Sequence, residues 1–240
     1  MKPKICVSLA AEKPSSLPAM IQKAEEAGAD LIEIRLDYLN MEARKSIGIL
    51  KDLASDAAVP MIATNRRYEE GGCKPQDEDS RIQTLIWAAQ AGFEYVDIEL
   101  EAPGIESVID NVRNCGSKLI ISSHNFRDTP SVQKMKEIIL SELKAGADIC
   151  KIVTTAQSIK DNVKCLLLVN EMSKITRIVA FAMGRLGLIS RILSPIFGGY
   201  FTFASLTENM KTAPGQITID ELRMLYERLG VCIDEDFGRD

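Results

Sequence analysis

The sequence has little of what metal, membrane and nucleic-acid proteins need. Its 240 residues include a single histidine, His124, which excludes a metal centre built on several imidazoles. No apolar run approaches the about 18 residues of a membrane-spanning helix. The formal net charge is −5, and no basic stripe is present. That balance argues against a nucleic-acid binder and against a polybasic membrane anchor.

The six cysteines also lack any paired spacing. They are spread along the chain without a CxxC pair, and some, such as Cys150, interrupt apolar runs. This usage is typical of a reduced, cytosolic protein rather than of a disulfide scaffold. The apolar stretch at the start of the chain, MKPKICVSLA, is too short and too soon followed by charged residues to be a signal peptide, so we expect a cytoplasmic protein.

What the sequence does contain is a regular alternation of short apolar runs and amphipathic stretches. Hydrophobic residues make up 46% of the chain and charged residues 26%, which are ordinary globular values that allow a large core. Eight apolar runs predict strands near residues 5–9, 31–36, 59–64, 94–100, 118–123, 148–153, 177–182 and 199–203. No linker divides them. The pattern predicts a single-domain (β/α)₈ barrel (TIM barrel) over residues 1–240, with a doubly wound open sheet as the alternative.

Three helix signals support this alternation. Apolar residues at helical spacing begin at Leu17 and run to Ala27. Thr129-Pro130 is typical of an N-cap followed by proline, and it predicts a helix whose apolar stripe contains Val132, Met135, Ile139 and Leu143. Near the end of the chain, Thr218 and Glu221 form a capping-box pattern.

An internal repeat relates three of the predicted strands. Gly28, Gly92 and Gly146 each precede a strand by a few residues, as a left-handed glycine at the end of a helix would. Aligning the repeat on these glycines places three charged side chains at one register position: Glu33, Asp97 and Lys151. Alternate strands of a barrel contribute to the same interior layer, so we expect these three charges to meet there and to pair.

Lys151 and His124 are the strongest candidates for chemistry. A lysine inside an apolar strand is either a desolvated nucleophile able to form a Schiff base with a ketone, or a side chain that snorkels or pairs with a carboxylate. His124 ends another predicted strand, where barrel enzymes gather their functional groups. It is either a general acid/base or a capping histidine.

Further candidates follow the predicted strands. Glu33 and Arg35 share one face of a strand, and Arg66 to Gly72 form a loop whose arginines could hold an anion. Arg191 could hold a carboxylate in bidentate fashion, and Thr212 and Gln216 could bond substrate hydroxyls. Each of these also has a plain structural interpretation, as a solvated loop, a helix arginine or a Pro-Gly turn.

Taken together, these segments resemble the type I 3-dehydroquinate dehydratase family. The resembling segments occur in family order over nearly the whole chain: 33–37, 66–72, 95–99, 122–126, 151–153, 183–184, 190–191, 197–198, 202–203 and 213–216. The resemblance implies a (β/α)₈ barrel that dehydrates 3-dehydroquinate to 3-dehydroshikimate without metal or organic cofactor, and it suggests a homodimer.

The resemblance also implies a role for each candidate residue. Lys151 would form the imine, His124 would act as general acid/base, and Glu33 would orient His124. The remaining residues would bind substrate: Arg35 and Arg66 with Glu70 beside them, Arg191 at the carboxylate, Phe203 against the ring, and Thr212 and Gln216 at the hydroxyls. Asn65 and Thr212 depart from the residues usual in the family, an aromatic side chain and a serine. The role of Asp97 stays open between catalysis and charge pairing.

Two other functions are compatible with the residues. A class I aldolase would share the Schiff-base lysine. It would usually act on phosphorylated sugars and need a phosphate-binding site after the last two strands, where no glycine-rich anion-binding loop is present. A binding barrel that has lost catalysis is the second alternative. The joint presence of Lys151, His124 and Glu33 argues against it.

Overall fold

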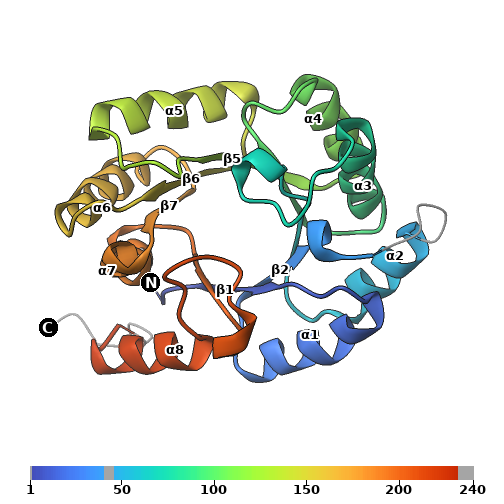
Figure 1. Ribbon diagram of the computed structural model, residues 1–240, viewed down its shortest axis with the longest axis horizontal. Helices are drawn as coiled ribbons and strands as arrows, with labels where there is room; N and C mark the ends of the chain where they lie inside the picture. Colours follow the sequence, from blue (N-terminus) through green and yellow to red (C-terminus); the bar gives the residue numbers. More distant parts are fainter. Residues whose placement is uncertain (1, 41–45, 232–240) are drawn as a thin grey trace, which may run out of the picture.

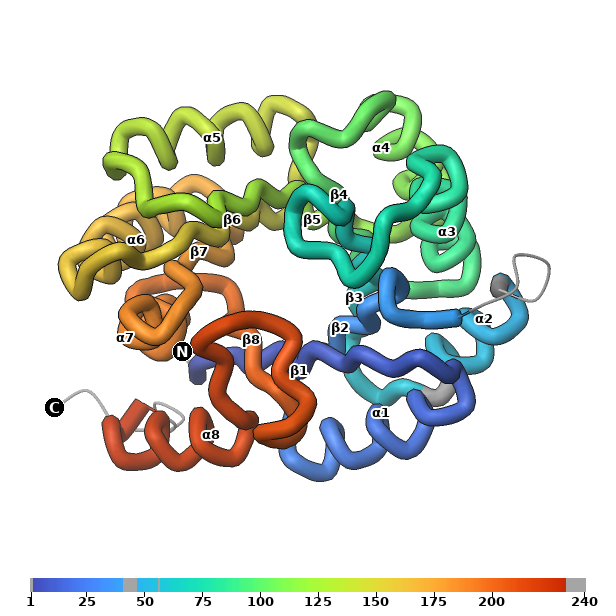
Figure 2. The backbone as a smooth tube through the Cα atoms, in the orientation of Figure 1, coloured from blue at the N-terminus to red at the C-terminus, as the bar shows by residue number. Residues whose placement is uncertain are grey.

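The eight predicted strands form a barrel. The computed structural model describes residues 2–40 and 46–231, and Figures 1 and 2 show its strands surrounded by helices. The strands are β1 Ile5–Leu9, β2 Leu31–Arg35, β3 Met61–Thr64, β4 Tyr95–Glu99, β5 Lys118–His124, β6 Ile149–Thr155, β7 Ile178–Met183 and β8 Thr202–Ala204. All observed pairs are parallel, in the order β7-β6-β5-β4-β3-β2-β1-β8. The Tyr200 N–H donates to the Ile178 carbonyl at 2.7 Å, which brings the two ends of the sheet together. The barrel prediction is confirmed, and the open doubly wound sheet is wrong.

The helices lie outside the strands and follow the expected alternation. They are α1 Leu17–Glu26, α2 Ser46–Asp56, α3 Glu78–Gln90, α4 Ile105–Asn114, α5 Val132–Ala145, α6 Lys160–Met172, α7 Leu188–Leu193 and α8 Ile219–Arg228. The capping box before α8 is confirmed, because Thr218 accepts from the Glu221 N–H and Glu221 accepts from the Thr218 N–H. In the described part of the chain, no helix is long and apolar enough to span a membrane.

The predicted start of α5 is wrong. The helix begins at Val132 with Ser131 as N-cap, whose hydroxyl accepts from the Lys134 N–H at 3.2 Å. Thr129 instead turns its hydroxyl toward β6 and donates to the Thr155 carbonyl at 3.0 Å. Both residues can cap a helix, and the bond to the strand leaves the capping position to Ser131.

The buried stripe of α5 also differs from the prediction by one position. Met135 and Ile139 are buried as expected, but the next fully buried side chain is Glu142, and Leu143 is half-buried. An acidic side chain therefore takes an apolar position between α5 and the barrel.

The three repeat glycines adopt the predicted conformation. Gly28, Gly92 and Gly146 have φ values of 81°, 100° and 103°, in the left-handed region that glycine occupies without strain. Each ends a helix just before β2, β4 or β6 begins, so the repeat sets these strands in equivalent register. Cys232, one of the six cysteines, lies outside the described residues.

The barrel interior has an apolar base and a charged upper layer. The base is formed by inward-facing side chains that include Cys6, Leu31, Ile62, Tyr95, Ile120, Ile149, Val179 and Phe201. Glu33, Asp97 and Lys151 stand two residues further along their strands than Leu31, Tyr95 and Ile149, on the same faces. The apolar base therefore places the charged layer near the carboxyl ends of the strands, where barrel active sites lie.

Candidate active site

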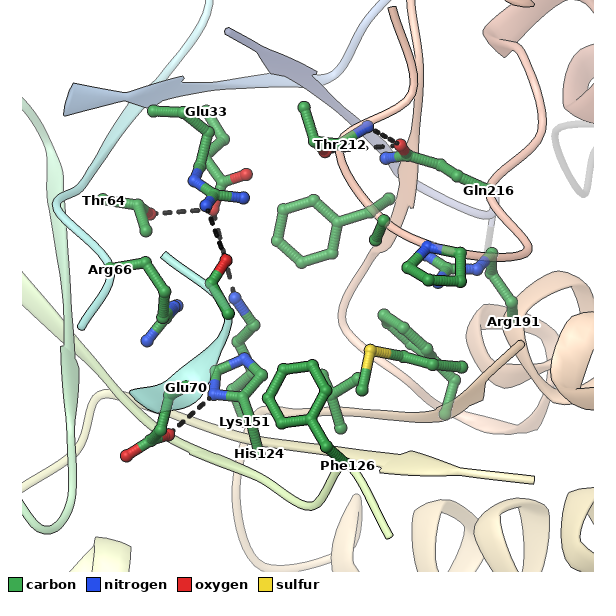
Figure 3. A pocket seen from close by; sticks show the side chains of 18 residues that line it. Glu33, Thr64, Arg66, Glu70, His124, Phe126, Lys151, Arg191, Thr212 and Gln216 are labelled. Atoms are coloured by element: carbon green, nitrogen blue, oxygen red, sulfur yellow. Dashed lines mark hydrogen bonds and ion pairs between the residues drawn. The ribbon is translucent and has the colours of Figure 1, made fainter. Parts of the chain in front are cut away.

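A single cavity at the carboxyl ends of the strands brings all the predicted site residues together (Figure 3). Its lining includes each of the ten: Glu33, Arg35, Arg66, Glu70, His124, Lys151, Arg191, Phe203, Thr212 and Gln216. Residues for which the sequence predicted no role complete the wall, among them Thr64, Phe126, Phe181 and Met183. The cavity therefore collects charged groups from most of the barrel around a partly aromatic wall.

Lys151 lies at the bottom of this cavity, buried and paired. Its Nζ is 2.7 Å from Asp97 Oδ2 and 4.0 Å from Glu33 Oε1. On its other side, the ammonium lies 4.6 Å from the ring centroid of Phe203. The prediction that Lys151, Asp97 and Glu33 converge in one layer is confirmed.

Asp97 is the main ion-pair partner of Lys151. Its second oxygen, Oδ1, accepts from Arg66 Nη2 at 2.8 Å and from Ser122 Oγ at 2.7 Å. Burial favours the neutral acid, but the positive charges of Arg66 and Lys151 outweigh it and hold the pKa of Asp97 well below its usual range. Asp97 is therefore a fixed anion at neutral pH, so the structure accounts for it as a charge partner.

Arg66 extends the ion pairing away from the cavity. Its Nη1 contacts Glu99 Oε1 at 2.7 Å, and Glu99 Oε2 lies 3.0 Å from Arg81 Nη1. Arg81, fully buried on α3, also pairs with Glu78 at 2.9 Å. We call the alternating series Glu78–Arg81–Glu99–Arg66–Asp97–Lys151 the charge chain. It connects the partly exposed start of α3 to the amine at the centre of the barrel.

His124, at the end of β5, has Glu70 as its direct partner. The distance from His124 Nδ1 to Glu70 Oε2 is 3.0 Å (Figure 3). Burial lowers the pKa of His124 well below its usual value, and the positive charges of Arg66 and Lys151 lower it further. Burial raises the pKa of Glu70 to about 7, against the opposing effect of Arg66. A neutral imidazole that donates from Nδ1 to a carboxylate leaves its Nε2 lone pair free to take a proton.

The expectation that Glu33 orients His124 is not met in this structure. Glu33 Oε2 accepts from Ser8 Oγ at 2.5 Å, and Oε1 accepts from Thr64 Oγ1 at 2.7 Å. These bonds hold Glu33 in the layer of Lys151, while Glu70 takes the place beside the imidazole. The contact of Glu70 depends on the loop after β3, whose path strand register does not predict.

Two glycines give that loop its path. Gly71 has φ 84°, and a Cβ added to Gly72 would lie 2.2 Å from the Arg66 carbonyl oxygen. Arg35 braces the same loop, since its Nη2 donates to the Gly71 carbonyl at 3.3 Å and also pairs with Asp37 at 2.7 Å. The tight turn returns Glu70 over the cavity.

Arg191 is a buried cation with spare hydrogen-bonding capacity. It is 1% exposed on α7, and its Nε and Nη2 have no hydrogen-bond partner among the described residues. Burial lowers the pKa of Arg191 to about 10. The guanidinium lies 4.2 Å from the ring centroid of Phe181, which stabilises the charge in part. A buried guanidinium that lacks a carboxylate partner is suited to binding an anion from outside.

The loop of residues 212–216 closes one side of the cavity. Gln216 Oε1 accepts from the Thr212 N–H at 2.8 Å (Figure 3). Thr212 Oγ1 contacts Ser8 Oγ at 3.2 Å. Thr212, one of the two departures from the family, thus faces the cavity. Asn65, the other departure, faces a separate hollow and donates to the Arg81 carbonyl at 3.1 Å.

Metal-binding geometry is missing from the described part of the chain. No group of three or more His, Cys, Asp or Glu side chains is placed to hold an ion there. The carboxylates that line the cavity have other partners, since Glu33 accepts from two hydroxyl groups and Glu70 lies beside the His124 imidazole.

Comparison with known proteins gives a consistent result. A model of the type I 3-dehydroquinase family matches residues 5–232. The chain is 40% identical over 210 residues to a 3-dehydroquinate dehydratase of Dehalococcoides mccartyi strain 195, covering 88% of this chain and 90% of the relative. It is 37% identical to the Arabidopsis thaliana bifunctional 3-dehydroquinate dehydratase/shikimate dehydrogenase, covering 92% of this chain and 36% of that longer protein.

Solved structures agree in fold. The Geobacillus kaustophilus 3-dehydroquinate dehydratase superposes with a TM-score of 0.89 at 26% identity, covering 100% of this chain and 93% of that one. The type I enzyme of Clostridium difficile, solved with covalently modified comenic acid, gives 0.86 at 29% identity, covering 97% and 94%. The family match over nearly the whole chain and these relatives lead to one conclusion: the chain belongs to the type I 3-dehydroquinase family.

Proposed function

We propose that this protein dehydrates 3-dehydroquinate to 3-dehydroshikimate in the shikimate pathway, through an imine formed on Lys151. The observation that carries the proposal is that one cavity holds a buried lysine, a histidine whose pKa favours the neutral form, and an arginine whose Nε and Nη2 have no hydrogen-bond partner among the described residues. The similar proteins are named 3-dehydroquinate dehydratases and match over nearly their whole length, which supports 3-dehydroquinate as the substrate. The cysteine usage supports the cytoplasm as its location.

The first step joins substrate and enzyme. The Lys151 ammonium first passes one proton to His124, and the neutral amine then attacks the ketone carbon and forms a carbinolamine. Loss of that oxygen as water, with protons supplied through His124, gives a protonated imine. Asp97, 2.7 Å from the amine, stabilises the positive charge in the same place before and after the step.

The second step removes the substrate hydroxyl. The protonated imine withdraws electrons, so the adjacent C–H becomes acidic and His124 Nε2 takes its proton to give an enamine. The enamine electron pair then expels the β-hydroxyl, which leaves as water with the proton from His124. Hydrolysis of the conjugated imine releases product and restores Lys151. The net change is the loss of one water, and His124 returns to its neutral state.

The remaining cavity residues hold the substrate in this scheme. Arg191 pairs with its carboxylate, and Phe203 packs against its ring. Thr212 and Gln216 bond its hydroxyl groups. Arg35 and Arg66 bind the substrate, and their side chains are held in place by Asp37 and by the charge chain, respectively.

Borohydride trapping tests the proposal. Reduction in the presence of 3-dehydroquinate, followed by mass spectrometry of the digest, is expected to give a stable adduct on Lys151. K151M should abolish the adduct and the activity, whereas K118M, which removes an exposed lysine of β5, should keep both. Active wild-type protein without an adduct on Lys151 would refute the imine chemistry. Cleavage of a sugar phosphate in place of dehydration would favour an aldolase.

We also propose that the protein forms a homodimer through the outer surface of α6 and α7. Ile159, just before α6, and Val163 and Leu167 within it are spaced four residues apart and are 47–56% exposed. Ile189 on α7, which contacts α6, is also exposed. Exposed apolar side chains on neighbouring helices are typical of an interface. V163E should give monomers in sedimentation analysis, whereas L140E, on the exposed face of α5, should leave a dimer. A wild-type monomer would refute this assembly.

A further inference from the structure

Glu142 is a fully buried carboxyl group on the outer side of the barrel wall, behind Lys151. It is 0% exposed on α5, and the imine scheme above does not use it. Its Oε2 accepts a hydrogen bond from the backbone N–H of Lys151 at 3.0 Å. Its Oε1 has no hydrogen-bond partner by geometry among the described residues.

The surroundings of Glu142 are those of an apolar core. Met135 and Ile139 precede it on the buried stripe of α5, and they pack against Cys150 and Ile152 of β6. Burial raises the pKa of Glu142 well above its usual value, although the Ser123 hydroxyl and the Lys151 N–H favour the ionised form. Burial therefore favours the protonated form of Glu142 more than it would in an exposed glutamate.

Such a group is unfavourable for stability at this position. A half-satisfied carboxyl in an apolar interface loses hydration without full compensation, and a leucine of similar volume would pack without that cost. Glu142 contacts both β5, which carries His124, and β6, which carries Lys151, so it is placed to fix the two strands relative to each other. Ser123 immediately precedes His124, and the strand register pairs Ser122 with Lys151.

We propose that Glu142 is a positioning residue for Lys151, which fixes the Lys151 peptide against β5 and so aligns the amine with His124. The inference rests on the proposed imine chemistry of Lys151. The reacting atoms must meet within a narrow geometry, and a displacement of about 1 Å can cost up to about 100-fold in rate. The bond at 3.0 Å acts on the backbone of the nucleophile itself, so its loss is transmitted to the amine.

Two substitutions separate positioning from packing. E142Q keeps an amide oxygen that can accept from the Lys151 N–H, whereas E142L fills the space without an acceptor. We expect E142L to lower kcat about 10-fold, with KM within twofold of wild type and a melting temperature unchanged or higher. E142Q should keep kcat within twofold. The rate of borohydride-trapped adduct formation should follow kcat in both variants.

The control is Ile139→Val, on the same buried face of α5. It should lower the melting temperature and leave kcat unchanged, because it removes packing without touching the Lys151 peptide. If E142L does not fold, E142M provides a second apolar side chain without an acceptor.

The outcomes distinguish this inference from the function on which it rests. Failure of wild-type protein to form the adduct overturns the imine chemistry, and this inference with it. A normal wild-type adduct together with wild-type kcat in E142L or E142M overturns the positioning role alone. An E142Q variant as slow as E142L also overturns it, because the hydrogen-bond acceptor would then not be what matters.

Discussion

Arg191 gives the sharpest test of the site, because its two expected effects have opposite signs. The guanidinium is buried and has no carboxylate partner in the described part of the chain, so it destabilises the free enzyme. The same unpaired group is the proposed partner of the substrate carboxylate. Replacing it with methionine, in R191M, should therefore raise the stability of the protein and weaken its use of substrate.

The magnitude follows from the pKa. Burial lowers the pKa of Arg191 from its usual value to about 10, and at about 1.4 kcal/mol per pKa unit this corresponds to about 3 kcal/mol. The folded-state pKa is lower than the unfolded one, so the cost is fully present at every pH below about 10. The Phe181 ring returns about 1–2 kcal/mol of it. A net gain of about 1–2 kcal/mol should raise the melting temperature by about 2–8 °C for a chain of this length.

The assay pairs thermal unfolding at pH 7 with dehydration kinetics followed by the absorbance of the conjugated product. Removing one partner of a buried charge pair costs about 2–5 kcal/mol, so kcat/KM should fall at least about 30-fold. R185M is the matched control, since it removes an exposed arginine just before α7 and should change neither quantity. A melting temperature at or below that of wild type, or kcat/KM within threefold, would refute the reasoning.

Three further predictions concern the surroundings of the reacting groups. The pKa of Glu70 is raised to about 7, so activity should fall as the pH drops through that value. The protonated acid would donate to His124 Nδ1, which places the ring proton on Nε2, the atom that must accept the substrate proton. An E70Q variant should lose this acidic limb of the pH–rate profile. A methyl group at Gly72 would meet the backbone of its own loop at 2.2 Å, so G72A should lower kcat about 10-fold, whereas G48A, at an open helix position, should not; equal rates would contradict the loop argument. Because the pKa of Glu142 is raised on folding, protonated Glu142 stabilises the fold fully below pH about 4.5, and this contribution is lost as the pH rises. In denaturant titrations, the free energy of unfolding of E142Q relative to wild type should therefore grow by up to about 1.4 kcal/mol per pH unit above that value. A difference that does not change with pH would count against a raised pKa of Glu142.

Strand geometry explains why much of the fold and site could be predicted. Side chains alternate along a strand, so the shared register of Glu33, Asp97 and Lys151 fixes their common direction once the strands are recognised. The eight apolar runs were sufficient for that, since parallel barrel strands are buried on both faces. The start of α5 could not be predicted in this way, because Thr129 and Ser131 are both residue types that cap helices. The hydrogen bond from Thr129 to β6 leaves Ser131 as the N-cap.

Loop and helix residues account for what the sequence could not provide. Glu70 was identified as a site residue, but its contact with His124 depends on a loop path set by close backbone approaches. Arg81 and Glu142 were not identified, because a charged residue on an amphipathic helix usually faces solvent. For Glu142 one signal was available: it stands three residues after Ile139, on the side of α5 that faces the barrel.

The charge chain has a consequence for how this sequence can change. Each internal member is buried between two opposite charges, so replacing one takes an ion-pair partner away from each of its two neighbours in the interior. Substitutions along it are therefore non-additive, and a change at Arg81 alters what is tolerable at Glu99 and then at Arg66. Sequence change in the outer helix α3 is thereby constrained by the chemistry at the centre of the barrel. Descendants of this sequence can exchange the chain as a set more readily than one residue at a time.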